Sequence, residues 1–221
     1  MIKTVYAQSG KPGVSRIEFV ELWRAHGTRA MLCHDYFGHV ARYVQSDVLT
    51  APTEELGSPL GFFGVGELCY PDRQRRDLSN ASASRRDIIV PHGQALFGSP
   101  HPVSHPCEER IIQDHHRAPI KVYAFLKRVP SLSRDAFLQQ WRESAGRVVG
   151  LASYVQSRSI DENSSFDGLD ELYFDRVDDA RAFLVRKDSA LRTGWSNLCD
   201  LTKNILLVTE QVVMYDRANY V

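Results

Sequence analysis

Eight histidines are the side chains in this sequence best suited to proton transfer near neutral pH, and all of them lie within the first 116 residues. The rest of the chain contains none. We therefore expect acid–base chemistry to belong to the N-terminal part of the chain. The eight are His26, His34, His39, His92, His101, His105, His115 and His116.

His26 has the most informative spacing of the eight. Phe19, Trp23, His26 and Ala30 follow one another at helical intervals, so they should form one stripe that faces a sheet. An imidazole between helix and sheet can act as a general acid or base, and Trp23 would then contact the substrate. The alternative interpretation is a core histidine held by a hydrogen bond.

Two more histidines flank the end of the same helix, in "LCHDYFGHV" (32–40). We expect His34 or His39 to serve as the acid or to orient His26, with Tyr36 contacting the substrate. Asp35 is a neighbour able to share a proton. The alternative is that this segment is only a solvated helix end.

The strand "RYVQSDV" (42–48) brings further polar side chains. Tyr43 could donate its hydroxyl to a substrate oxygen, and Arg42 could hold the same oxygen. Glu67 lies in an otherwise apolar strand, where burial could raise its pKa and make it a base or a substrate contact. A structural salt bridge is the other interpretation of Glu67.

The segment "HPVSHPC" (101–107) places His101, His105 and Cys107 close together. Imidazole and thiolate suit zinc, but the two prolines exclude a helix that would bring the histidines onto one face. No CxxC or HExxH motif occurs. We predict no metal and no organic cofactor, and a pocket-lining loop in which His101 contacts the substrate.

The elements that must position these residues occur twice in the chain. "GVSRIEFVELWR" (13–24) matches "SLSRDAFLQQWR" (131–142), and "RYVQSDV" (42–48) matches "SYVQSRS" (153–159). "GVGELCYPD" (64–72) matches "GLDELYFDR" (168–176), and "EERII" (108–112) matches "TEQVV" (209–213). The first copy carries two short insertions, one after its first helix and one within 49–61. Four matches in the same order indicate an internal repeat.

Each copy predicts the order β-α-β-β-α-β. The first copy should have strands at 2–7, 42–48, 62–70 and 107–113. Its helices should run from an N-cap at Ser15 to about residue 33 and over 72–97, with a break near Pro91. The second copy should have strands at 120–128, 153–160, 168–174 and 204–214. Its helices should run from an N-cap at Ser133 to about residue 150 and over 177–195.

This element order is the ferredoxin-like unit, in which helices cover one face of an antiparallel sheet. The other face needs cover, and two copies in one chain can supply it for each other. We therefore predict an α+β fold made of two ferredoxin-like repeats, residues 1–117 and 118–221, packed sheet to sheet as an intrachain dimeric α+β barrel.

The motifs "SRxxFxxxWR", "YVQ" and "ELxF" resemble those of the EthD family of the dimeric α+β barrel superfamily. The resemblance covers nearly the whole chain as two tandem copies. The family's W-R-x-x-H-x-P helix motif is altered in both: "WRAHGT" has His26 one position early, and "WRESAG" has Ala145 in place of the histidine. The resemblance implies cyclase, dehydratase, isomerase, cofactor-free monooxygenase or haem chemistry, because the fold is shared by all of these.

Composition excludes several other classes. Lys plus Arg equals Asp plus Glu, at 27 each, so nothing favours nucleic acid or an acidic membrane. The N-terminus lacks the apolar core of a signal peptide, and no apolar run could span a membrane, so we expect a cytoplasmic protein with free cysteines. No GxGxxG, GxxxxGK[ST] or GxSxG motif occurs.

These observations predict an enzyme of the lyase or isomerase type that acts without a cofactor on an aromatic or polyketide-like carbonyl compound. His26 would be the base, and the second copy would be a scaffold. A cofactor-free monooxygenase, a haem protein and a non-catalytic ligand-binding module are the alternatives. The only partner expected is a small-molecule substrate, and a homodimer of the whole chain is allowed.

Overall fold

A computed structural model of the protein describes residues 1–49, 61–97, 103–114, 118–146, 150–186 and 190–217. The chain forms two compact units. Unit 1 comprises the described residues of Met1–Val48, Gly61–Pro106 and Gln211–Val221, and unit 2 comprises those of Leu49–Leu60 and Cys107–Glu210. All the histidines among the described residues lie in unit 1.

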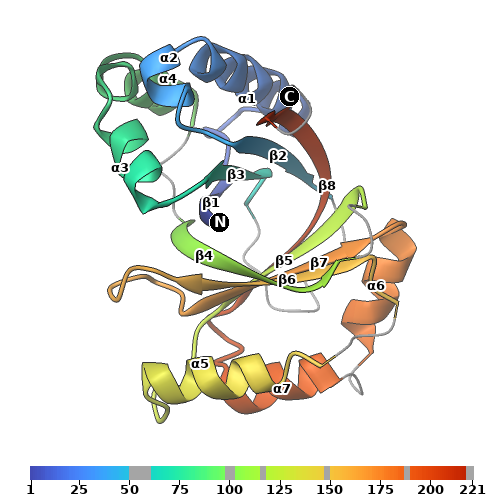
Figure 1. The fold of residues 1–221 in the computed structure, drawn as a ribbon. Helices are drawn as coiled ribbons and strands as arrows, with labels where there is room; N and C mark the ends of the chain where they lie inside the picture. The colour runs from blue at the N-terminus through green and yellow to red at the C-terminus, as the bar shows by residue number, and fades with distance from the viewer. Residues whose placement is uncertain (50–60, 98–102, 115–117, 147–149, 187–189, 218–221) are drawn as a thin grey trace. The chain divides into compact units, whose positions relative to one another are not determined.

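Unit 1 is built on the antiparallel strand order β1-β3-β2, with β1 at Ile2–Gln8, β2 at Arg42–Val48 and β3 at Gly64–Tyr70. Its helices lie together on one face of this sheet (Figure 1). They are α1 (Arg16–Met31), α2 (His34–Phe37), α3 (Arg73–Ala81), the π-helical turn η2 (Arg85–Ile89) and α4 (Val90–Leu96).

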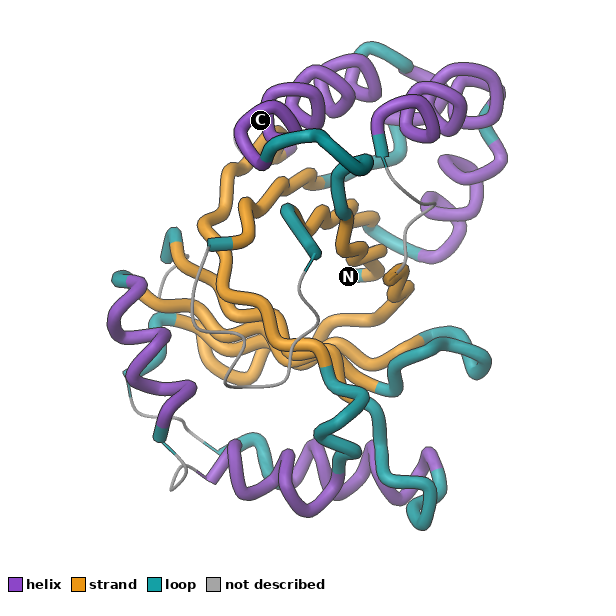
Figure 2. The backbone as a smooth tube through the Cα atoms, turned by 180° about the vertical axis from the view of Figure 1, so that it is seen from behind, coloured by secondary structure: helices purple, strands orange, loops and turns teal. Residues whose placement is uncertain are grey.

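Unit 2 has the antiparallel strand order β4-β6-β7-β5-β8. The strands are β4 (Val103–Asp114), β5 (Ile120–Leu126), β6 (Ser153–Ser159), β7 (Gly168–Phe174) and β8 (Ile205–Asp216). Strand β4 joins this unit from residue 107, and β8 belongs to it up to residue 210. The helices α5 (Arg134–Glu143), α6 (Val177–Val185) and α7 (Ala190–Leu198) lie on one face of the sheet, as the view from behind also shows (Figure 2).

The first helix of each unit begins in the same way. The Ser15 hydroxyl accepts a hydrogen bond from the Glu18 amide at 3.2 Å, and the Ser133 hydroxyl accepts one from the Ala136 amide at 3.2 Å. These side chains satisfy amide groups that the first helical turn leaves without a partner. Both N-caps predicted from the sequence are therefore confirmed.

The middle strands of the two units also share their register and their polar contacts. Gln45 lies opposite Gly66, and Gln156 lies opposite Asp170. Each glutamine amide donates to the carbonyl of the helix tryptophan, at 3.0 and 3.1 Å, and to a tyrosine hydroxyl, at 2.6 and 3.0 Å. The glutamine of the repeated Tyr-Val-Gln-Ser thus links the helix to the sheet by hydrogen bonds in both units. This is a structural role.

Each unit further contains one buried ion pair at the same place in its sheet. Lys3 and Glu67 lie 3.8 Å apart in unit 1, and Lys121 and Glu171 lie 2.5 Å apart in unit 2. All four side chains are almost completely buried. This favours the salt-bridge interpretation of Glu67 over a role as a base, because a nearby ammonium stabilises the charged carboxylate.

Several predicted element boundaries are wrong. The second helix of the first repeat is interrupted near Ser82, where α3 ends, whereas Pro91 lies in the first turn of α4, which tolerates proline. Strand β4 begins at Val103 rather than 107, and α5 ends at Glu143 rather than near 150. The helix predicted over 177–195 is two helices, α6 and α7. The insertion at 49–61 lies largely outside the described residues.

All four cysteines are free and buried. None of the helices in the described parts of the chain is long and apolar enough to cross a membrane.

Candidate functional site

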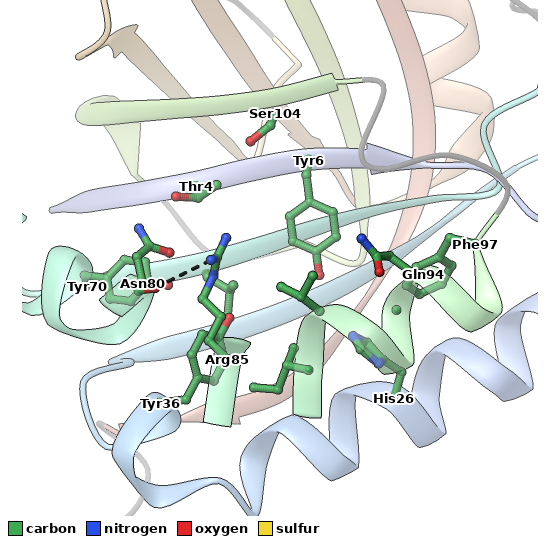
Figure 3. Close-up of a pocket in the computed structure, with 14 residues that line it drawn as sticks. Thr4, Tyr6, His26, Tyr36, Tyr70, Asn80, Arg85, Gln94, Phe97 and Ser104 are labelled. Atoms are coloured by element: carbon green, nitrogen blue, oxygen red, sulfur yellow. Dashed lines mark hydrogen bonds between the residues drawn. The ribbon is translucent and has the colours of Figure 1, made fainter. Parts of the chain in front are cut away.

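Unit 1 encloses a cavity of about 290 Å³ between its helices and its sheet (Figure 3). Apolar side chains from η2 and α4 form part of its wall, and hydroxyl, amide, imidazole and guanidinium groups point into the rest. The lining residues are Thr4, Tyr6, His26, Tyr36, Leu68, Tyr70, Asn80, Arg85, Ile89, Val90, Gly93, Gln94, Phe97 and Ser104. An apolar cavity with a few convergent polar groups is the usual form of a small-molecule site.

The histidine of this cavity belongs to a pair. His26 Nδ1 and His92 Nδ1 lie 2.8 Å apart, and the two rings are stacked with centroids 5.1 Å apart. Helix α1 supplies the first ring and α4 the second. Because one Nδ1 must donate and the other accept, the pair holds one shared proton between the rings and leaves each Nε2 for other partners.

Burial acts on the second member of this pair. Burial first, and then the positive charge of Arg29, lower the pKa of His92 below its ordinary value of 6.5. His92 is therefore neutral at neutral pH. A neutral neighbour can accept a hydrogen bond from His26 and can continue to accept it when His26 carries a proton.

Three tyrosines line the same cavity. Burial is the main cause that raises the pKa of Tyr6 and of Tyr36 well above 10.0, and it also raises the pKa of Tyr70. The neighbouring phenols add to the effect for Tyr6 and Tyr36, because two phenolate charges would repel. All three hydroxyls therefore stay protonated at neutral pH. Tyr6 is hydrogen-bonded to Tyr43, and Tyr36 to Tyr70, so a ligand oxygen would accept from these hydroxyls in place of those partners.

Small residues create the space of the cavity. A Cβ atom on Gly93 would lie 3.5 Å from His26 and 3.4 Å from Phe97, so this position of α4 leaves the histidine accessible. A Cβ atom on Gly66 would collide with the Tyr6 ring. The glycine in β3 therefore permits the tyrosine in β1 to pass beneath the helices.

Unit 2 fills the corresponding space with side chains. Asp170, at the position of Gly66, accepts hydrogen bonds from Trp141 Nε1 at 3.2 Å, from the Tyr154 hydroxyl at 2.8 Å and from Trp195 Nε1 at 2.6 Å. The Trp195 carbonyl of α7 accepts a hydrogen bond from the Cys199 amide at 2.9 Å, just as the Gly93 carbonyl of α4 accepts one from the Phe97 amide at 2.9 Å. Trp195 and Gly93 are therefore at equivalent positions, and Trp195 is 2% exposed. The indole thus occupies in unit 2 the place that glycine leaves open in unit 1.

Two residues selected from the sequence line the cavity, His26 and Tyr36. His26 is only half-buried, because Gly27 takes the sheet-facing place in the stripe with Phe19, Trp23 and Ala30. Trp23 is fully buried and does not line the cavity.

The other selected residues lie elsewhere in the structure. His34 is exposed, and His39 is near Arg75, with 3.4 Å between Nδ1 and Nη1. Tyr43 is buried behind the cavity wall, where its hydroxyl accepts from Gln45. Arg42 is also buried and pairs with Asp216 at 3.5 Å. None of these four lines the cavity. His101 is outside the described residues.

Sequence reasoning missed most of the cavity wall. His92 contacts His26 from 66 positions away, and Asn80 and Arg85 come from the arginine-rich stretch 73–86. One signal was present for Tyr6. The repeat aligns Tyr6 with Ala124 and Gly66 with Asp170. In unit 1 a large aromatic side chain therefore lies opposite a glycine, whereas in unit 2 a small alanine lies opposite a carboxylate.

The donor set fits neither a metal nor a haem. Within the described ranges, no group of three or more His, Cys, Asp or Glu side chains could hold a metal ion. His105 is fully buried in β4, and the segment 103–107 is strand rather than loop. The cavity of about 290 Å³ lies at the low end of the range for drug-sized ligands, about 300–1,000 Å³, which leaves too little room for a macrocycle.

Known structures resemble this fold. No family model matches the chain, and no curated protein matches it significantly in sequence. An anthrone oxidase-like protein superposes with a TM-score of 0.62 over 98% of this chain and 94% of its own, at 8% identity. A proposed monooxygenase from Fusobacterium nucleatum gives 0.58 over 97% and 92%, at 8% identity. A proposed chlorite dismutase gives 0.57 over 100% and 98%, at 8% identity.

At 8% identity, these likenesses show the fold alone. The chemistry of this chain has to be argued from its own cavity.

Proposed function

We propose that the protein is a cofactor-independent enzyme that removes a proton next to the carbonyl group of a small aromatic compound bound in the unit 1 cavity. The observation that carries this proposal is the His26–His92 pair, with 2.8 Å between the Nδ1 atoms, at a cavity lined by three neutral phenols. A base and oxygen-binding donors are the two parts that enolisation requires.

In the proton-transfer step, His26 donates from Nδ1 to His92, which leaves His26 Nε2 as an unprotonated base. The C–H bond next to the carbonyl breaks, its proton goes to Nε2, and its electron pair moves to the carbonyl oxygen as an enolate. The imidazolium so formed keeps its hydrogen bond to neutral His92. Tyr6 or Tyr36 donates to the enolate oxygen.

The enolate can then follow more than one course. Return of the proton to another carbon is an isomerisation, and loss of a neighbouring hydroxide as water is a dehydration. Both use the same base, which is why the site supports a lyase or isomerase type without choosing between them.

Anthrone is a suitable first probe because its methylene group is activated by an aromatic carbonyl. The assay is exchange of the methylene hydrogens for deuterium in anaerobic D2O, followed by NMR. We expect wild-type protein to accelerate exchange and His26→Gln to lose about 100-fold or more of that acceleration. Glu21→Gln is the matched control, since Glu21 is exposed on the same helix. Full exchange activity in His26→Gln would refute the role of His26 as the base.

A second candidate is a cofactor-free oxygenase, which the names of two structural relatives favour: an anthrone oxidase-like protein and a proposed monooxygenase. The first step would be the same deprotonation, and the carbanion would then reduce O2. Oxygen uptake during aerobic incubation with anthrone, dependent on His26, would favour this candidate. Exchange without oxygen uptake would favour the first.

We further propose that the two units are diverged copies of an EthD-like unit, with unit 1 active and unit 2 a scaffold. The matched N-caps, glutamine contacts and Lys–Glu pairs support two copies. The indole of Trp195 fills in unit 2 the position that is open in unit 1, which supports a binding role for unit 1 and a structural role for unit 2.

A further inference from the structure

Arg85 differs from the other arginines near the cavity in its surroundings. It is half-buried, lines the cavity, and extends into it from the start of η2 (Figure 3). Its guanidinium makes one long hydrogen bond, from Nη1 to the Asn80 carbonyl at 3.5 Å. Among the described residues no carboxylate lies within ion-pair distance of it.

Three other arginines of this unit are paired with carboxylates. Arg24 lies 2.7 Å from Asp47, and Arg76 lies 3.2 Å from Asp77. Arg86, the next residue along the chain, is exposed and lies 2.8 Å from Asp87. Arg85 therefore brings an unbalanced positive charge to the cavity. A guanidinium that is partly removed from water without a carboxylate favours an anionic ligand, because a charged pair recovers part of the lost solvation.

The backbone directs this side chain inward. Ser82 Oγ accepts from the Arg85 amide at 3.2 Å and so begins the turn. Residues 85–89 then form a π-helical turn, which widens the helix by one residue per turn and often marks functional sites. Successive side chains of a helix point in different directions, so Arg85 lines the cavity while the adjacent, paired Arg86 faces solvent.

The groups beside Arg85 are donors as well. Tyr36 and Tyr70 are held neutral by burial, so they offer O–H groups, and the charge of Arg85 opposes the rise in the Tyr36 pKa. Asn80 and Thr4 line the same end of the cavity (Figure 3). No carboxylate is among the lining residues. This end of the cavity thus offers N–H and O–H donors to an oxygen anion.

We propose that the ligand of this cavity is an aromatic carboxylate, whose carboxylate group is held by Arg85 with help from the hydroxyls of Tyr36 and Tyr70. The aromatic rings lie along the apolar wall toward His26. The position of the reacting carbon near His26 rests on the proposed function, whereas carboxylate binding by Arg85 stands independently of it.

The test compares two probes of the same shape, 2-naphthoate and neutral 2-naphthamide, by isothermal titration calorimetry at pH 8. We expect wild-type protein to bind the carboxylate at least about tenfold more tightly than the amide, since a charge-assisted hydrogen bond contributes more than a neutral one. Arg85→Gln should lose this preference and bind both probes alike. Arg85→Lys should keep part of it, because the charge remains without the fork geometry.

Arg86→Gln is the matched control, since it removes an adjacent exposed arginine that is paired with Asp87. It should bind both probes as the wild type does. An unchanged preference in Arg85→Gln, or equal binding of the two probes by the wild type, would overturn the proposal. Thermal unfolding of each variant checks that the fold is kept.

The two proposals fail in different ways. His26→Gln should keep the preference for 2-naphthoate even if it abolishes deuterium exchange. If His26→Gln leaves exchange unchanged, the proposed function is wrong, while the Arg85 result stands on the binding ratio alone.

Discussion

In the proposed mechanism, the His26–His92 contact joins the base to its orienting partner through the Nδ1 atoms of the two rings. The pair accepts one proton without losing its hydrogen bond, because an imidazolium still donates to a neutral imidazole. A second proton would make both Nδ1 atoms donors and break the contact. Burial and then Arg29 lower the pKa of His92, so the pair binds a second proton only at lower pH.

This arrangement predicts a change of pH dependence in His92→Phe. Phenylalanine keeps a ring stacked on His26 and removes the nitrogen that accepts the proton. The His26 imidazolium then loses its acceptor, so the acid limb of the pH–rate profile for anthrone exchange should move to lower pH. The rate at neutral pH should fall by about tenfold or more, since an unoriented base is less effective.

The measurement is the exchange rate between pH 5 and pH 9 in both proteins. A purely structural role of His92 would lower the rate equally at every pH and leave the midpoint of the acid limb in place. That outcome would contradict the pairing mechanism.

At the scale of elements, helix α1 and its counterpart α5 reach their sheets over matching glycines. Gly64 begins β3 and Gly168 begins β7, and each lies under the tryptophan of the helix above it. A Cβ atom on Gly168 would lie 2.9 Å from the far end of the Trp141 ring, whereas one on Gly64 would overlap the Trp23 ring. The first unit is therefore packed more tightly at this point than the second.

We predict that Gly64→Ala destabilises the protein more than Gly168→Ala does. Overpacking in a filled core costs about 1–3 kcal/mol, and the Trp23 ring has to shift to make room. In Gly168→Ala a shift of a few tenths of an ångström suffices, so the cost should lie below that range. Urea unfolding of both variants gives the comparison. Equal destabilisation would mean that the two helices lie equally far from their strands.

Differences between equivalent helices and strands explain why unit 1 has a cavity at the position that side chains fill in unit 2. Helix α4 presents Gly93 and Gln94 where α7 presents Trp195, and β3 has Gly66 where β7 has Asp170. A tryptophan in a core contributes a large buried apolar area, so unit 2 gains packing where unit 1 keeps space for a ligand. Under the proposed function, unit 1 would bind the ligand and unit 2 would contribute chiefly to stability.

At the scale of the whole molecule, the buried Asp170 couples global stability to pH. Burial raises its pKa from 3.8 to about 6, although four hydrogen-bond donors oppose the rise. Since the folded pKa is the higher one, this carboxyl contributes stability that is fully present below about pH 4. That stability is lost as the pH rises to about 6, and it amounts to about 3 kcal/mol.

Asp170→Asn should remove this part of the pH dependence. Free energies of unfolding, measured between pH 4 and pH 7.5, should decline less with rising pH in the variant than in the wild type. Asp179→Asn is the control, because Asp179 is exposed on α6. An unchanged slope in Asp170→Asn would contradict the raised pKa. Comparing slopes separates this effect from any constant cost of the substitution.

Local patterns in the sequence indicated most of the elements and both helix N-caps. Ser15 and Ser133 predict helix starts because N-capping depends on residues three apart. The repeat predicts matched strands, and the helical spacing of α1 indicated His26 as a candidate site residue. These features depend on neighbours along the chain, which the sequence records directly.

Only the tertiary structure decided which of these residues share a cavity. His92 reaches His26 from 66 positions away, and Arg85 lines the cavity while the adjacent Arg86 is exposed. Tyr43 and His34 carry equally suitable groups, but packing buries the first against helices α1 and α2 outside the cavity and leaves the second in solvent. A site is a set of long-range contacts, and those contacts depend on how buried faces fit together rather than on the order of residues.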